Sequence, residues 1–547
     1  MGDVMPTSAL ALFLQNLVSG SLICRALRSA AETVRRAARA SSVCAFVSRP
    51  ERLTSVFYQS FFGRLAAAVP DACTQALRRS GAFLERVIPG SFTLWALKWL
   101  GERFFLFFCL FVAAHALVPF ALYRNPYTVA AMAFFAVGFA SHLAFSREPQ
   151  GGKKRADPVF LLYFFSIAAS AVYSLFGAGA GMASTTTAVL YLTAILFAAL
   201  IANAFCDRAR LLLLIRVIVF ATVAVALYGV WQYLRGIPID VTQTDQTTGG
   251  ASLAMGRADS TLGNPNVLAS WLILVIPFSV SLFFTAKGFR KKLLLFLAAL
   301  LMLACLFLTQ SRSGWIGFAV AAITYVFLLD WRLVPLFAAA ALLSFPFWPD
   351  FIMDRLLTLG SDTSSVYRYT IYAGAFRMAL TNWATGIGIG LEFFKRYINN
   401  YVYFAYGTAP VHSHMLPLQI WLESGIVALA SFLWFLARLI KKAAAYISFQ
   451  KSHTAPLYNR PGPGNTAYNT RLILTACLSA VTGFLAMGFF EYVWFFPRGM
   501  NHFFMIVGIF ICAVNLAAPH GAGQPYGGAA KPERHKVASG VSNKPKN

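Results

Sequence analysis

Two histidines close to the start of an apolar segment are the first residues of this chain that suggest chemistry. His412 and His414 lie two residues apart, and Glu423 follows His414 by nine residues. Histidine exchanges a proton near neutral pH and commonly serves as a general base. Ionisable side chains at the mouth of a membrane helix are costly and point to a function. A single histidine there is more often a hydrogen-bonded helix cap, so the pair needs support from neighbouring polar groups.

A metal site is the competing interpretation of the two histidines. Residues two apart on a helix point about 200° away from each other, which argues against joint ligation. The aspartates of the predicted external loops form no cluster with metal-ligand spacing. They are Asp240, Asp245, Asp259, Asp354 and Asp362. The sequence therefore predicts neither a metal ion nor another cofactor.

Three arginines fall in segments that border apolar runs. Arg257 precedes Asn264 and Asn266, where Gly-Asn and Asn-Pro pairs favour a turn into a helix. The turn explains the asparagines but not the arginine. Arg312 lies in a short polar connection between two apolar runs, where a snorkelling anchor is the simpler alternative. A guanidinium held by two helices also matches the oxygens of a phosphate in two-pronged fashion.

The third arginine, Arg368, lies in an amphipathic stretch with apolar residues at 366, 369, 373, 376 and 380. This spacing predicts a helix lying on the membrane surface. A run of alternating glycines, 386–390, follows without the strand and helix of a dinucleotide site. We interpret it as a flexible or tightly turned loop at the mouth of a substrate site.

Composition places these residues in a membrane protein. The 547 residues are 58% hydrophobic and only 12% charged, about half the charge of a soluble chain. The net charge of +26 would suggest nucleic acid in a soluble domain, but lysine and arginine gather on one side of the apolar runs. We attribute the charge to the positive-inside bias and predict no nucleic-acid partner.

Apolar length predicts an all-α polytopic membrane protein with about twelve transmembrane helices. Their approximate limits are 104–123, 127–146, 158–177, 184–205, 211–232, 266–285, 293–309, 314–330, 333–349, 413–438, 472–490 and 502–518. The basic residues place both termini in the cytoplasm. The same topology places two long loops outside, about 235–266 and 350–411.

Three regions follow from this pattern. Residues 1–92 are rich in arginine with interleaved apolar residues, which predicts basic amphipathic helices on an anionic cytoplasmic surface, broken near Pro50, Pro70 and Pro89. Residues 93–520 form the transmembrane domain. Residues 521–547 are predicted to be a disordered cytoplasmic tail.

The ordered set of motifs resembles the O-antigen ligase/polymerase family over roughly residues 100–520. The motifs are Arg257…Thr261-Leu-Gly-Asn-Pro-Asn266, Thr309-Gln-Ser-Arg312-Ser-Gly-Trp315, Arg368…Gly386-Ile-Gly388 and His412-Ser-His414…Glu423-Ser-Gly425. Met415 departs from the family pattern, in which an asparagine often follows the second histidine. The arginine-rich N-terminal region has no counterpart in that pattern.

The resemblance implies a GT-C-like glycosyltransferase of the bacterial inner membrane. Such enzymes transfer a glycan from undecaprenyl diphosphate to an acceptor hydroxyl on the extracytoplasmic face, inverting and without a metal. Carried over, Arg257, Arg312 and Arg368 would bind the donor diphosphate, Arg312 would also be catalytic, and His414 would be the general base. His412, Asn264, Asn266 and Glu423 would be supporting residues. The acceptor, a glycan, lipid-linked sugar or protein, stays open.

Two other classes of function stay open beside the enzyme. Members of related families suggest a small-anion transporter, whose path the arginines would line. The chain shows no paired interrupted spans in two matching halves, the usual sign of an inverted-repeat transporter. A non-catalytic assembly protein is supported only by the arginine-rich N-terminal region.

Overall fold

The computed structural model describes residues 56–146, 157–176, 182–237, 256–357, 363–403, 410–453 and 466–517, together with Ser29, Thr33 and Arg36. All regular structure in these residues is helical. The predicted tail 521–547, the breaks near Pro50 and most of the arginine-rich residues before position 56 lie outside the described residues. The same holds for the middle of the predicted loop 235–266.

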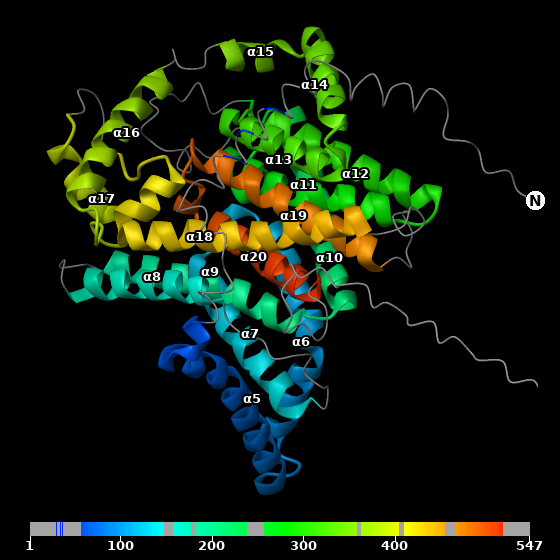
Figure 1. Ribbon diagram of the computed structural model, residues 1–547, viewed down its shortest axis with the longest axis vertical. Helices are drawn as coiled ribbons and strands as arrows, with labels where there is room; N and C mark the ends of the chain where they lie inside the picture. Colours follow the sequence, from blue (N-terminus) through cyan, green and yellow to red (C-terminus); the bar gives the residue numbers. More distant parts are fainter. Residues whose placement is uncertain are drawn as a thin grey trace, which may run out of the picture. The chain divides into compact units, whose positions relative to one another are not determined.

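Eleven of the described helices are long and apolar enough to cross a membrane, which confirms the predicted all-α polytopic membrane fold (Figure 1). They are α6 (Phe92–Leu117), α7 (Asn125–Phe145), α8 (Pro158–Phe176), α9 (Met182–Ala204), α10 (Arg208–Leu234), α11 (Pro265–Thr285), α12 (Phe289–Leu308), α13 (Arg312–Asp330), α18 (Leu416–His453), α19 (Thr466–Gly488) and α20 (Pro497–Ala517).

The predicted span 333–349 differs from the other eleven. It folds as α14 (Leu333–Ser344) followed by a short 3₁₀ turn, η6 (Phe345–Phe347). Twelve helical residues reach about 18 Å, less than the thickness of a hydrocarbon core. The chain nevertheless returns to the end of the bundle where α13 begins. The evidence is that Arg368, which follows α14, bonds to the same carboxylate of Glu491 as Asn266 at the start of α11. Here α14 is a short return segment, not a full span.

The start of the chain's helical region also departs from expectation. α5 (Phe61–Val87) runs unbroken through Pro70, so the predicted break there is wrong. Proline removes one hydrogen bond and bends a helix, and the alanines around it are strong helix formers. Ser91 caps α6 through its side chain, so the first span begins at Phe92 rather than at position 104.

The insert 350–411 is largely helical rather than a loop. It contains α15 (Asp350–Leu357), α16 (Thr363–Thr381) and α17 (Leu391–Tyr397). One face of α16 packs with α18 in a small apolar cluster that includes Ile371 and Leu422. The predicted apolar face of α16 stays exposed.

The glycine run forms the tightly turned of the two predicted kinds of loop, with positive φ at Gly386, Gly388 and Gly390, and it packs against a break in α18. Gly425 has φ 78° and interrupts the helix. The amide of Ile426 donates to the carbonyl of Trp383, and the amide of Ile387 donates to the carbonyl of Leu422. Residues 386–390 are buried, so they brace α18 and offer no open mouth.

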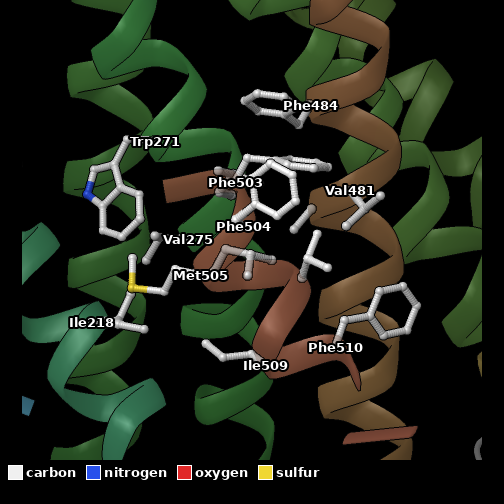
Figure 2. Packing of buried hydrophobic residues seen from close by; sticks show 14 of the residues in the cluster. Ile218, Trp271, Val275, Val481, Phe484, Phe503, Phe504, Met505, Ile509 and Phe510 are labelled. Carbon is white, nitrogen blue, oxygen red and sulfur yellow. The ribbon is translucent and has the colours of Figure 1, made fainter. Parts of the chain in front are cut away.

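The main apolar core surrounds α20. Figure 2 shows Phe503, Phe504 and Phe510 along this helix, in one apolar cluster with Trp271 and Phe484. These last two side chains come from α11 and α19, and all five are almost fully buried. This core supports the end of the helices at which the predicted site residues gather.

Candidate active site

The carboxylate of Glu491 joins three predicted site residues. Glu491 lies in the connection between α19 and α20 and is buried. Its Oε2 accepts from Asn266 Nδ2 at 2.9 Å and from Arg368 Nη2 at 3.0 Å. Its Oε1 lies 3.4 Å from His414 Nδ1. The sequence analysis did not single out Glu491, which is the common partner of residues from three separate segments.

The charge of Glu491 is fixed by these neighbours. Burial by itself raises the pKa of a carboxyl group, but the positive charge of Arg368 and the hydrogen bond from His414 act in the opposite direction. The net result is a pKa well below the usual range for glutamate. Glu491 is therefore an anion at neutral pH, and its ion pair with Arg368 persists there.

His414 lies in a tight turn just before α18, not on a helix. Its backbone has φ 54°, a left-handed conformation that is uncommon outside glycine. The rings of His412 and His414 are 4.2 Å apart, so the predicted divergence of the two side chains is wrong. The amide of His414 donates to His412 Nδ1 at 3.1 Å, which puts the ring proton of His412 on Nε2.

Glu423 is connected to the turn that holds His412 and His414 by hydrogen bonds through Gln419. The amide of Ser413 donates to Gln419 Oε1 at 2.9 Å, and Gln419 Nε2 donates to Glu423 Oε1 at 2.9 Å. The hydroxyl of Tyr191 donates to Glu423 Oε2 at 2.7 Å. A chain of hydrogen bonds thus runs from α9 to the backbone between the two histidines.

Arg257 is bound to the turn that leads into α13. Its Nε donates to the carbonyl of Thr309 at 2.9 Å. Gln310 Nε2 donates to the carbonyl of Gly256 at 2.6 Å. These bonds clamp the residues around Arg257 to the connection between α12 and α13, so the guanidinium is rigidly placed.

Asn264 and Asn266 have different structural roles. Asn264 Oδ1 caps α11, accepting from the amides of Asn266 and Val267, which is the structural turn that the sequence suggested. The side chain of Asn266 instead bridges Ser311 and Glu491, since its Oδ1 accepts from Ser311 Oγ at 2.8 Å. Arg312 follows Ser311 directly as the first residue of α13.

Three connections at this end contain a left-handed residue that is not glycine. They are Ser260, Gln310 and His414, with φ of 52°, 52° and 54°. Each lies shortly before a helix, α11, α13 or α18. Such conformations cost free energy and tend to occur at functional sites.

Three arginines act as like charges on a fourth, Arg257, at this end of the bundle. Burial lowers the pKa of Arg257 to about 10, and the charges of Arg355, Arg368 and Arg312 contribute to the lowering, while Glu491 opposes it. Arg355, on α15, was not predicted from the sequence. Guanidinium groups that share a region with few carboxylates form a site suited to a polyvalent anion.

Two of these residues gave only weak signals in the sequence. Glu491 is the single acid next to the long apolar run 472–490, a position where an ionisable group is costly and worth testing. Arg355 is one of several charged residues in the insert and lies in a part of it, now α15, for which no helix was predicted. Among the described residues, no group of three or more histidine, cysteine, aspartate or glutamate side chains is arranged to hold a metal ion.

Comparison with known families gives one match. Residues 297–433 match the family model described as O-Antigen ligase. The matched segment includes Arg312, Arg368 and His414, while Arg257 and Glu491 lie outside it. No curated protein matches the chain.

Proposed function

We propose that this chain, of which residues 297–433 match the O-Antigen ligase family model, transfers a glycan from undecaprenyl diphosphate to an acceptor hydroxyl. The coarser conclusion, a membrane protein of glycan assembly, follows from the family and the eleven apolar helices. The donor, the inverting mechanism and the independence from metal are the proposal. His414, Arg257, Arg312 and Arg368 are the residues to which it assigns the chemistry.

One observation carries the proposal: Glu491 connects the proposed base to a proposed donor-binding arginine. His414 Nδ1 faces Glu491 Oε1, and Arg368 holds the other oxygen of the same carboxylate. If Nδ1 carries the proton, Glu491 accepts it and Nε2 keeps its lone pair for the acceptor hydroxyl. A carboxylate that fixes the tautomer of a histidine in this way is a common feature of general bases.

The reaction is a substitution at the anomeric carbon. The acceptor oxygen attacks that carbon while its proton passes to His414 Nε2. The bond between the anomeric carbon and the diphosphate oxygen breaks, and undecaprenyl diphosphate leaves with the electron pair. Attack from the side opposite the leaving group inverts the anomeric configuration. A placed base commonly contributes roughly 10²–10⁴-fold to such a step.

The arginines stabilise the leaving group. Charge grows on the diphosphate as the bond breaks, and fixed donors aimed at that charge favour the transition state. The bonds from Arg257 to Thr309 and from Gln310 to Gly256 hold these donors in place before substrate binds. Arg312 would contribute both to donor binding and to this stabilisation.

The proposal places this end of the helices on the extracytoplasmic face of the bacterial inner membrane, with both termini in the cytoplasm. Basic side chains at the other end support that orientation. Examples are Lys291 at the start of α12 and Arg332 before α14.

The test uses the full chain in lipid nanodiscs with an undecaprenyl-diphosphate glycan and several candidate acceptors. The wild-type protein should form a transferred glycan and release undecaprenyl diphosphate. His414→Asn should lose turnover yet bind the donor as tightly as wild type, because asparagine tolerates a left-handed backbone but lacks Nε2. Transfer at the wild-type rate by this variant would refute His414 as the base.

A measurement of anion flux distinguishes the proposed glycan transfer from the transporter hypothesis. Anion movement in proteoliposomes without release of undecaprenyl diphosphate would favour transport and contradict the proposed transfer. Arg332→Ala is a suitable control for the arginines, since Arg332 lies at the other end of α13 from Arg312.

A further inference from the structure

The helix α5 has a surface that glycan transfer does not use. α5 leads into the start of α6, whose 26 residues extend about 39 Å. Beyond the far end of α6, the carbonyl of Val118 accepts from Arg498, seven residues after Glu491. α5 therefore lies at the end of α6 remote from His414 and its partners.

One face of α5 packs against α7, as Figure 1 shows for the two neighbouring helices. A Cβ atom on Gly81 would lie 2.7 Å from the carbonyl oxygen of Ala144, so the two backbones approach closely there. Leu77 and Leu84 lie on the same side of α5 and are half-buried. This face accounts for part of the apolar surface of the helix.

A second apolar face of α5 is exposed. We call it the α5 stripe; its members are between 46% and 68% exposed, and they are Phe61, Leu65, Val69, Phe83 and Val87. Their spacings of four and eighteen residues place them on one side of a helix with 3.6 residues per turn. No described element covers the stripe, although exposed apolar surface of this extent is unfavourable in water.

Arginines border the stripe. At 100° per residue, Arg64, Arg79 and Arg86 fall on one edge of it, and all three are exposed. The acids of α5 are Asp71 and Glu85, and Glu85 pairs with Lys98 at 2.7 Å. The exposed apolar face of α5 is therefore flanked by positive charge.

Aromatic side chains next to α5 have the character of a membrane interface. Trp95 stacks on Phe92 at 5.5 Å between ring centroids and on Trp99 at 6.2 Å. Phe92 and Trp95 are exposed, and the guanidinium of Arg103 lies 5.0 Å from the Trp99 ring. Aromatic and basic residues gather in this way where membrane helices leave the hydrocarbon.

We propose that α5 lies on an anionic phospholipid surface, with the α5 stripe in the acyl region and Arg64, Arg79 and Arg86 at the level of the phosphates. An amphipathic helix with apolar side chains below and arginines beside them fits such a surface. A second copy of the chain or another protein would leave the bordering arginines facing like charge or needing a matching acidic patch. The acidic bilayer supplies both the apolar depth and the negative charge.

The experiment measures the depth of α5 in the full-length protein. Cys24, Cys44, Cys73 and Cys206 are replaced by serine, and one fluorophore is attached at Leu65→Cys on the stripe. A matched protein has the fluorophore at Thr74→Cys, a half-buried position on the side of α5 opposite the stripe. Both are placed in nanodiscs that contain lipids with a nitroxide on the acyl chain, with or without phosphatidylglycerol.

The stripe label should be quenched by the nitroxide lipid, and more strongly when phosphatidylglycerol is present, whereas the label at Thr74→Cys should be quenched little. Equal quenching at the two positions would overturn the proposal. So would a stripe label that is shielded from water yet not quenched, because protein would then cover the stripe.

A charge reversal separates lipid recognition from general charge. The triple change Arg64→Glu, Arg79→Glu and Arg86→Glu should abolish the dependence on phosphatidylglycerol. The control is Arg290→Glu, Lys291→Glu and Lys292→Glu at the start of α12, which alters the net charge equally. Loss of the dependence in both variants, or in neither, would contradict the assignment to α5. The readout does not require glycan transfer, so its failure leaves the proposed function untouched.

Discussion

Arg498 and the arginines around Glu491 lie near each other in the fold but have opposite environments. Arg498 is 2% exposed, and its three nitrogens donate to the carbonyls of His115, Thr261 and Val118 at 2.7–2.9 Å. Its guanidinium also lies 4.7 Å from the ring of Tyr123. Each of the three guanidinium nitrogens of Arg498 thus donates a hydrogen bond to the backbone of the protein.

The arginine group that includes Arg257, Arg312 and Arg368 is arranged differently. Arg312 and Arg368 act on Arg257 as like charges, and the only acid among the charges that shift the pKa of Arg257 is Glu491. Placing like charges together raises the free energy of the empty protein and lowers it when an anion binds. The comparison separates an arginine whose guanidinium is bonded to three backbone carbonyls from arginines that we propose bind the donor diphosphate.

The largest effect that tests this contrast is expected at Arg498. Arg498→Met should lower the free energy of unfolding by about 5 kcal/mol, because three buried carbonyls lose their donors at roughly 1–3 kcal/mol each. Thermal unfolding in detergent measures it. An unchanged melting temperature would show that Arg498 does not hold α6 to α20.

The next effect is expected at Glu491. Glu491→Gln should reduce stability at neutral pH by about 3 kcal/mol, since it leaves Arg368 without its buried partner. The pKa of Glu491 is depressed in the folded state, so its contribution is present above the unfolded pKa and is lost as pH falls toward the folded value.

The difference in melting temperature between wild type and Glu491→Gln should therefore shrink as the pH is lowered below the ordinary range of carboxyl groups. A difference that stays constant from neutral to acid pH would contradict the ion pair. Glu392→Gln, on the exposed start of α17, is the control and should show no such change.

A smaller effect, confined to ligand binding, is expected at Arg312. Arg312→Ala should weaken donor binding by about 2 kcal/mol, roughly thirtyfold in Kd, the usual contribution of a charge-assisted hydrogen bond. Its melting temperature without donor should stay at the wild-type value or rise, since a like charge is removed. A lower melting temperature with unaltered donor binding would assign Arg312 to the same class as Arg498.

The smallest effect is expected at Glu423, which reaches the histidine turn indirectly, through Gln419 and through Tyr492. Glu423→Gln keeps the size of the side chain and one acceptor, so kcat should fall by about tenfold or less while KM for the donor stays constant. Steady-state kinetics at varied donor concentration measure both. A change in KM alone would place Glu423 in donor binding instead.

Residues that the sequence predicted as site candidates do lie together, but their geometry was not predicted. Asn266, Arg368 and His414 all meet the carboxylate of Glu491, and they were selected because polar residues are rare in an apolar chain and their order resembles that of a family. Glu491 escaped notice because it follows the apolar run of α19 without a motif. Its partners, moreover, lie 225, 123 and 77 residues away.

The failures in the fold have local physical causes. The divergence of His412 and His414 was derived from helical spacing, but a left-handed backbone at His414 turns the two rings toward each other. Pro70 was expected to end a helix, yet α5 continues through it. Apolar length alone predicted a full membrane span over residues 333–349, although the helix α14 ends at Ser344.

At the left-handed residues before α11, α13 and α18, thermal stability and catalytic activity favour different amino acids. Glycine adopts this conformation without the steric cost, so selection for thermal tolerance alone would favour Gln310→Gly. That change also removes the amide that ties Gly256 in place, and the backbone beside Arg257 would gain freedom. Variants evolved for hot conditions should therefore keep glutamine at this position whenever survival also depends on the product.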